Sequence, residues 1–210
     1  MRGKDPQEYI LSGTCARKAE LASKPVEDPG YFTADALRTY LASHGITIDG
    51  KIIRMPQRWK ENGIVIASTS SAPVAGLINR CNKSSQNFFA EALAKQSGED
   101  YRRRHRDFTG TSWQAGKAAA VAFFEAHHID AEALRAFDGS GLSRDDRVTA
   151  RMLTELLATM NVHSYAKAFR DSLPIAGVDG TIRKRLIEVK GKVQAKTGSI
   201  GRVRALSGYA

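Results

Sequence analysis

The sequence predicts an α+β fold in which several helices pack on an antiparallel sheet. Two patterns lead to this prediction. The middle of the chain carries apolar residues at helical spacing, most regularly at Leu153, Leu156, Leu157 and Met160. Near the end, residues 193–197 alternate apolar with polar or long side chains, as a half-buried strand does. Residues 203–209 form a second strand-like run, and Gly198 and Gly201 punctuate the turn, so we predict a hairpin.

The composition is that of a globular protein. The 210 residues are 42% hydrophobic and 26% charged, which allows one large domain or two small ones. No apolar run approaches membrane-spanning length, and the first residues lack the apolar core of a signal peptide. We therefore expect no transmembrane segment and no export signal within this chain.

The net charge of +10 permits anionic partners, either nucleic acid or another anionic polymer. The densest basic run lies at residues 101–106. No interleaved aromatic pattern, zinc-finger spacing or RNA-binding signature accompanies it. We interpret it as a solvated loop at the end of a helix and expect no nucleic-acid partner.

The first third of the chain gives few structural signals. Residues 1–30 contain scattered glycine, proline and charge with no sustained period. Thr33 is predicted to be the N-cap of a helix that ends before Gly45. Residues 46–50 and 63–68 are predicted to be short strands.

Helices are predicted in the next segment. Residues 71–81 lead into a helix that ends near Gly98, with an apolar face made of Phe88, Phe89, Ala92 and Leu93. Thr111 or Ser112 then opens an alanine-rich helix.

Turns and two further helices complete the approach to the hairpin. A glycine-rich turn is predicted at residues 138–144, and Thr149 caps the strongly amphipathic helix that follows. A short helix over residues 165–171 is stopped by Pro174. The loop at residues 173–181 then leads to the first strand of the hairpin.

Cysteine and histidine give no metal signal. Cys15 and Cys81 have no metal-binding spacing, and they leave open one disulfide in an oxidising compartment. His127 and His128 lack partner ligands at helical spacing, so we expect them at a helix C-terminus, where the helix dipole favours them.

Two short motifs carry candidate chemistry. In Lys196-Thr-Gly198, a strand presents an ammonium group and a hydroxyl, and the glycine lets a ligand backbone approach, so the strand can bind a carboxylate. In Ser85-Gln-Asn87, a loop entering a helix can point a hydroxyl and an amide into one cleft. The hydroxyl can pass a proton, and the amide can hold both a lysine and a carbonyl. Taken alone, the first motif is a common tripeptide and the second an ordinary capping sequence.

The order of the motifs favours the chemical interpretation. Between them lie the glycine-rich turn at residues 138–144 and the loop at residues 173–181. In kind and order, these four segments resemble those of class C low-molecular-mass penicillin-binding proteins, the serine D-alanyl-D-alanine carboxypeptidases and endopeptidases of peptidoglycan. The resemblance runs from about Val26 to the end of the chain. It implies part of a penicillin-binding, β-lactamase-like transpeptidase domain.

The resemblance also implies an acyl-enzyme mechanism that needs no cofactor or metal. A serine attacks the D-Ala-D-Ala carbonyl, D-alanine leaves, and water releases the acyl group. Ser85 would assist proton transfer to the leaving amine, and Asn87 would orient the catalytic lysine and the acyl group. Lys196 and Thr197 would bind the terminal carboxylate, and the Ser199 N–H would supply half of the oxyanion hole. β-Lactams would acylate the same serine, and the full-length protein would be periplasmic or in the cell envelope.

The glycine-rich turn would extend the substrate site. A rigid loop could present Arg144 to an acidic group and Leu142 to an aliphatic stem, as a meso-diaminopimelate side chain requires. A structural turn with a surface arginine is the alternative, and the residues leave both open. Asp138 is expected to fix the turn rather than to titrate in catalysis.

The family's first motif, Ser-x-x-Lys, which holds the nucleophile and its base, has no counterpart in residues 1–84. Cys15-Ala-Arg-Lys18 offers a thiol instead, and Ser164-Tyr-Ala-Lys167 lies where the family has only a short helix. The chain also stops within the second strand of the hairpin. We therefore expect an internal fragment without the nucleophile. Residues 1–30 would be the remnant of a preceding inserted domain, and residues 31–210 the C-terminal part of the catalytic domain, truncated at its end.

Two functional hypotheses follow. The chain is either part of a D-Ala-D-Ala carboxypeptidase whose nucleophile lies upstream, or a non-catalytic module that binds peptidoglycan peptides through Lys196 and Thr197. In both, the chain alone is expected to form no penicillin adduct. A nucleic-acid-binding domain rests on charge alone and would show a steep salt dependence of affinity.

Overall fold

The computed structural model describes residues 10, 12–16, 25–55 and 64–210. Its contacts divide the chain into two units, Met1–Ser68 and Thr69–Ala210. The domain boundary predicted between residues 30 and 31 stays a prediction. No helix in the described ranges is long and apolar enough to cross a bilayer.

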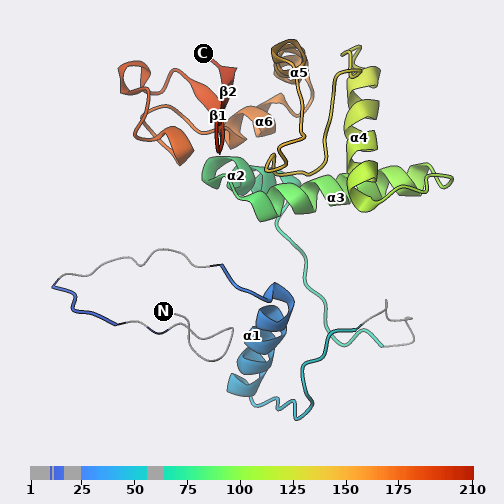
Figure 1. Ribbon diagram of the computed structural model, residues 1–210, viewed down its shortest axis with the longest axis vertical. Coiled ribbons are helices and arrows are strands. Elements are labelled where there is room, and N and C mark those ends of the chain that lie inside the picture. The colour runs from blue at the N-terminus through green and yellow to red at the C-terminus, as the bar shows by residue number, and fades with distance from the viewer. Residues whose placement is uncertain (1–9, 11, 17–24, 56–63) are drawn as a thin grey trace. The chain divides into compact units, whose positions relative to one another are not determined.

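Helix α1 (Pro29–Ser43) is the regular element described in the first unit (Figure 1). Asp28 is its N-cap, because the Asp28 carboxylate accepts a hydrogen bond from the backbone N–H of Tyr31 at 3.0 Å. Pro29 occupies the first position, where no N–H is needed. The predicted cap at Thr33 is wrong: its hydroxyl lies inside the helix and donates to the carbonyl of Pro29.

Neither strand predicted in the first unit is present in its described part. Residues 46–50 and 64–68 have no strand structure, and Gly63 lies outside the described residues. Ile64, Val65 and Ile66 are 91%, 81% and 96% exposed. A β-branched run forms a strand only when a neighbour accepts its backbone hydrogen bonds and covers one face, and the described residues supply no such neighbour here.

The second unit packs helices against a two-stranded antiparallel sheet, which confirms the predicted α+β class. In Figure 1, α2 and α3 run along one side of this unit, with α4 crossing α3 and with α6 and the hairpin beside α2. The elements are α2 (Val74–Ser84), α3 (Asn87–Arg104), α4 (Ser112–Ala126), α5 (Ala150–Val162), α6 (Ala166–Ser172), η1 (Gly180–Ile182), η2 (Ile187–Val189), β1 (Gln194–Ile200) and β2 (Val203–Tyr209).

Helix α3 continues beyond Gly98, where the prediction ended it. Gly98 is buried where α3 packs on α4, and a Cβ there would stand 2.5 Å from the backbone nitrogen of Gly116. The glycine therefore serves a close helix crossing rather than a helix end. As a result the basic run, predicted as a loop, begins inside α3. Arg103 and Arg104 form ion pairs there with acidic residues one turn earlier.

The predicted caps of α4 and α5 are confirmed. The hydroxyls of Thr111 and Thr149 accept hydrogen bonds from the N–H groups of Gln114 and Met152 at 3.3 Å and 3.1 Å. His127 is the C-cap of α4, as expected. Beside these helices lies one small core, made of Phe124, Ile129, Leu134 and Met152.

The predicted hairpin is also confirmed, with its turn at Gly201, but Gly198 lies within β1 rather than in the turn. Strands β1 and β2 pair antiparallel, with Lys196 opposite Ser207 and Gly198 opposite Ala205. A second small core of Ala176, Ile182 and Ala195 joins the hairpin to the preceding loop.

Candidate active-site cleft

The residues predicted for the site line one cleft of about 700 Å³. Its walls are the turn after α2, the start of α3, residues 134–148, and the hairpin. The predicted residues that line it are Ser85, Asn87, Leu142, Arg144, Lys196, Thr197, Gly198 and Ser199. The fold thus brings both short motifs and the glycine-rich turn to one place.

Lys196 and Ser85 are in direct contact. The ammonium nitrogen of Lys196 lies 2.8 Å from Ser85 Oγ and also donates to the backbone carbonyl of Thr197. Ser85 ends α2 in a left-handed conformation, with φ of 51°. This conformation separates α2 from α3, which agrees with the predicted loop entering a helix, although α2 itself was not predicted as a separate helix. For a non-glycine residue it costs about 1–2 kcal/mol. Ser85 and Asn87 line the same cleft.

Burial lowers the pKa of Lys196, and the effect of Cys81 opposes this only in part. Cys81 is a free, buried thiol whose pKa is raised by the same burial. Burial disfavours the charged form of a lysine because it removes hydrating water. Lys196 therefore gives up its proton more readily than an exposed lysine.

Strand β1 presents an open backbone edge to the cleft. The N–H of Ala195 donates to the carbonyl of Pro174 at 2.9 Å, on the side away from β2. Because backbone groups alternate along a strand, the N–H and C=O of Thr197 and Ser199 face this same side. The hydroxyl of Thr197 is also held, since it shares a 2.9 Å hydrogen bond with the hydroxyl of Thr181.

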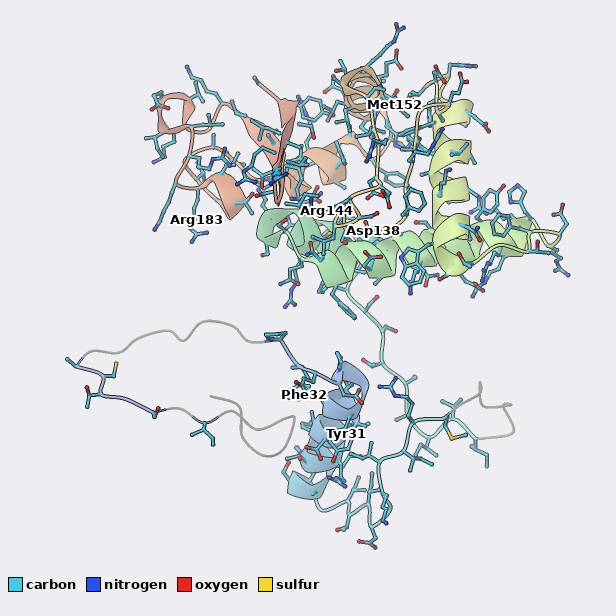
Figure 2. All side chains as sticks on the ribbon, in the orientation of Figure 1. Tyr31, Phe32, Asp138, Arg144, Met152 and Arg183 are labelled. Atoms are coloured by element: carbon cyan, nitrogen blue, oxygen red, sulfur yellow. The ribbon has the colours of Figure 1, made fainter. Side chains whose placement is uncertain are left out.

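Asp138 fixes the glycine-rich turn, as expected. Its carboxylate accepts hydrogen bonds from the N–H groups of Gly141 and Ser143 at 2.6 Å and 2.7 Å. Figure 2 shows Asp138 and Arg144 in this turn, near α3. A Cβ on Gly139 would stand 2.6 Å from the carbonyl oxygen of Ala90 in α3, so only glycine fits this approach.

Glu91 does not line the cleft, but it holds the glycine-rich turn that does, and the sequence interpretation missed it. It stands on α3 one turn after Asn87, and its carboxylate accepts four hydrogen bonds, from Gly139 N, Ser140 N, Ser140 Oγ and Trp113 Nε1. Burial alone would raise the pKa of Glu91, but the hydrogen bonds outweigh it and hold the pKa below its usual value. The sequence signal was the spacing of four from Asn87, which puts both on one helix face.

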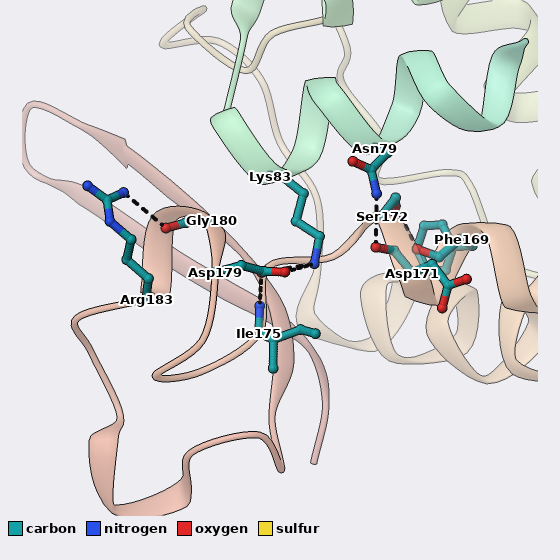
Figure 3. A network of polar contacts seen from close by, with 9 residues as sticks. All are labelled: Asn79, Lys83, Phe169, Asp171, Ser172, Ile175, Asp179, Gly180 and Arg183. Atoms are coloured by element: carbon teal, nitrogen blue, oxygen red, sulfur yellow. Dashed lines mark hydrogen bonds and ion pairs between the residues drawn. The ribbon is translucent and has the colours of Figure 1, made fainter.

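The loop at residues 173–181 is pinned to α2 (Figure 3). The Lys83 ammonium lies 2.7 Å from Asp179 Oδ2, and Asp179 Oδ1 accepts a hydrogen bond from the N–H of Ile175 at 2.8 Å. Asn82 donates to the buried hydroxyl of Ser172 at 2.8 Å. Because this loop bonds to β1 through Pro174 and Thr181, these contacts link α2 to the strand that carries Lys196.

The literal Ser-x-x-Lys match lies outside the cleft. The Lys167 ammonium pairs with Asp171 at 2.6 Å, and its side chain is 88% exposed. Neither Ser164 nor Lys167 lines the cleft, and Lys18 of the other match lies outside the described residues. Within the described ranges, no three His, Cys, Asp or Glu side chains are grouped so as to hold a metal ion.

A strand carrying Lys-Thr-Gly across a cleft from a Ser-x-Asn turn is the arrangement of serine enzymes that recognise D-alanyl peptides and penicillins. The class defined by this site is confirmed by comparison with known families. Residues 2–210 match the D-Ala-D-Ala carboxypeptidase 3 (S13) family, and the chain belongs to it.

Individual relatives agree with the family. The D-alanyl-D-alanine carboxypeptidase of Actinomadura sp. (strain R39) is 32% identical over 197 residues, which cover 90% of this chain and 35% of that protein. The carboxypeptidase DacB of Haemophilus influenzae is 29% identical over 211 residues, covering 98% and 43%.

Solved structures show the same fold. Penicillin-binding protein 4 (dacB) of Haemophilus influenzae, complexed with a β-lactam, matches with a TM-score of 0.70 and 30% identity, over 87% of this chain and 42% of that one. A second structure of that protein gives a TM-score of 0.71. The chain thus spans less than half the length of these relatives.

Proposed function

We propose that this chain forms the peptide-recognition side of a serine D-Ala-D-Ala carboxypeptidase and endopeptidase, which acts on peptidoglycan stem peptides through an acyl-enzyme. The observation that supports this most is the 2.8 Å contact between Lys196 Nζ and Ser85 Oγ beside an open strand edge. The cleft offers a cation, a proton relay and backbone donors together, as cleavage of a C-terminal D-alanine requires.

In this proposal, β1 binds the end of the peptide. The Lys196 ammonium and the Thr197 hydroxyl receive the terminal carboxylate, and Gly198 lets the peptide backbone lie against the strand. The Ser199 N–H donates to the carbonyl oxygen as it becomes an oxyanion. Loss of one such donor typically removes about 2.7–4 kcal/mol of transition-state stabilisation.

Ser85 transfers a proton during acylation, and Asn87 orients the acyl group. In acylation, the serine oxygen of a Ser-x-x-Lys segment forms a bond to the carbonyl carbon, and the bond from that carbon to the D-alanine nitrogen breaks. The proton of the serine hydroxyl passes to the lysine of that segment, and Ser85 Oγ, held by Lys196 Nζ, relays a proton from that lysine to the departing amine. The Asn87 amide orients the acyl group and the catalytic lysine of the Ser-x-x-Lys segment. Water then releases the acyl group.

Arg144 and Leu142 bind the residue before the D-Ala-D-Ala terminus. A guanidinium matches a carboxylate in two parallel hydrogen bonds, and Leu142, which is 53% exposed, can cover an aliphatic stem. A meso-diaminopimelate side chain offers both features. β-Lactams are the corresponding inhibitors, and the periplasm or cell envelope is the place where such peptides occur.

The test is binding of a diacyl-Lys-D-Ala-D-Ala peptide by calorimetry. Replacing Lys196 by alanine should weaken binding at least about tenfold, because a charge-assisted contact is lost. Lys192→Ala, which removes an exposed charge four residues away, is the matched control and should bind like wild type. Equal affinity for both variants would refute the assignment of the carboxylate site.

The alternative function is a binding module without catalysis, which would hold peptidoglycan peptides through the same Lys196 and Thr197 strand. Both functions predict that labelled penicillin leaves no adduct on this chain after denaturation. A persistent adduct would contradict both. An in-frame Ser-x-x-Lys upstream of Met1 in the gene would support the enzyme.

A further inference from the structure

Glu91 connects the glycine-rich turn at residues 138–144 to helix α3 of the second unit. It is half-buried on α3, and three of its four hydrogen bonds come from the turn at residues 138–144. The distances are 3.1 Å from Gly139 N, 3.2 Å from Ser140 N and 2.7 Å from Ser140 Oγ. Hydrogen bonds to a charged acceptor are about twice as strong as neutral ones. Glu91 is therefore the main polar anchor of this turn on α3.

We propose that Glu91 is a positioning residue for substrate selectivity. By fixing the turn that carries Leu142 and Arg144, it sets how well the cleft distinguishes a peptide with an acidic group next to D-Ala-D-Ala from one without it. This inference rests on the proposed function, since it assumes that Arg144 receives that acidic group.

Hydrogen bonds within the turn tie its residues together, so an anchor at its start helps to position its end. Asp138 ties the backbone of the turn to itself through Gly141 and Ser143. Gly139 lies against α3 with no room for a side chain. Arg144, at the far end, extends toward the hairpin, where a Cβ on Gly201 would stand 3.2 Å from Arg144 Nη2. Loss of the anchor therefore shifts the guanidinium across the cleft.

The charge of Glu91 matters as well as its shape. All four partners are donors, and the carboxylate offers only acceptors. In Glu91→Gln, the NH2 group would have to replace one carboxylate oxygen and would face N–H donors. The variant keeps the size of the side chain but loses every N–H contact on the oxygen that the NH2 group replaces.

Trp113 gives this anchor an optical reporter. Its indole N–H and the N–H of Gly139 bond to the same carboxylate oxygen, Glu91 Oε2, at 2.9 Å and 3.1 Å. The Lys95 ammonium lies over the same indole, 3.6 Å from the ring centroid. The only other tryptophan in the sequence is Trp59, so a Trp59→Phe background isolates the fluorescence of Trp113.

The experiment compares two acyl-D-Ala-D-Ala peptides that differ by one carboxylate, with meso-diaminopimelate or lysine at the third position. Wild type should prefer the acidic peptide at least about tenfold, through its contact with Arg144. Glu91→Gln should lose most of this preference while its affinity for the lysine peptide stays within about twofold. A merely structural role would lower both affinities together.

Two variants control for unrelated effects, and a third is a separate test of the anchor. Trp113→Phe removes the one bond that does not come from the turn, and Glu125→Gln removes an exposed carboxylate on α4. Both should keep the preference. Ser140→Ala removes a single bond from the turn and should lose about threefold of it, which tests the idea even if Glu91→Gln does not fold.

The fluorescence measurement is independent of the affinities. In the Trp59→Phe background, the acidic peptide should change the emission of Trp113 and the lysine peptide should not, and Ser140→Ala should reduce the change. The inference is wrong if a folded Glu91→Gln or Ser140→Ala keeps the full preference, or if wild type binds both peptides equally. If wild type binds neither peptide, or binds them independently of Lys196, the proposed function itself fails.

Discussion

Lys196 combines a charge that a carboxylate ligand needs with a burial that disfavours this charge. Its ammonium donates hydrogen bonds to Ser85 Oγ and to the Thr197 carbonyl. Burial lowers its pKa, so the protonated form, which attracts carboxylates, and the neutral form are closer in energy than in an exposed lysine. The charge of Lys196 is therefore more sensitive to pH than that of an exposed lysine.

This balance predicts a pH dependence of peptide binding. Affinity for an acyl-D-Ala-D-Ala peptide should fall as pH rises through the lowered pKa of Lys196, below the value of about 10.4 typical of an exposed lysine. Calorimetric titrations across the alkaline range measure this. Lys196→Arg keeps its charge throughout and should show no such fall. An affinity of wild type that stays constant up to the ordinary lysine pKa would contradict the prediction.

Glu91 predicts a second pH effect, on stability. Its pKa is lower in the folded protein than in the unfolded chain, so the ionised carboxylate stabilises the fold above the unfolded pKa of about 4.3. This stabilisation is lost as pH falls through the folded pKa. The difference in unfolding free energy between wild type and Glu91→Gln, measured by urea denaturation, should therefore shrink in acid. A difference that does not change with pH would show that the charge is not what anchors the turn.

The residues that line the site could be predicted from sequence. The residues that hold them in position could not. Ser85, Asn87 and Lys196 belong to ordered motifs with recognisable chemistry, and the cleft contains all three. Glu91 is one acidic residue among many on helices, and its importance comes from donors 22 to 49 residues away. The left-handed conformation of Ser85 was equally hidden, because nothing in its local sequence demands a glycine-type backbone.

At the level of elements, local signals predicted local structure well. Thr111 and Thr149 could be predicted as caps because a cap needs only a hydroxyl and a backbone N–H three residues later. The predictions were wrong where the structure of a segment depends on a partner that is distant in sequence. Residues 64–68 have strand-forming side chains but no described partner, and Gly98 ends no helix because α4 needs the space.

Replacement by alanine should have opposite effects on stability at Gly98, which lies where α3 crosses α4, and at Gly76, which lies in α2. Gly98→Ala should destabilise the protein by about 1–3 kcal/mol, because its Cβ would overlap the backbone of Gly116. Gly76→Ala, at an exposed position of α2, meets only Ala72 Cβ at an ordinary 3.6 Å and should stabilise by about 0.5–1 kcal/mol. Urea unfolding of both variants tests this. If the two change stability in the same direction, close packing at Gly98 is not the reason for the glycine.

At the scale of the whole molecule, the cleft is a property of one unit. Every residue that lines it belongs to Thr69–Ala210, and so does every contact described for Lys83, Glu91, Asp138 and Lys196. The helix caps of α4 and α5 and both small cores lie in the same unit. The sequence analysis did not find this division, because the strand-like patterns at residues 46–50 and 63–68 gave no sign of a boundary after residue 68.

A chain of residues 69–210 should therefore fold and bind the same peptide, with an affinity within about twofold of the full 210-residue chain, since no binding contact is removed. Circular dichroism reports the helices, and calorimetry with the acyl-Lys-D-Ala-D-Ala peptide reports the cleft. Lys196→Ala in the shorter chain should weaken binding as much as it does in the longer one, which shows that both use the same site. A shorter chain that keeps its helices but no longer binds the peptide would mean that residues 1–68 complete the cleft, and the division into two units would not apply to the site.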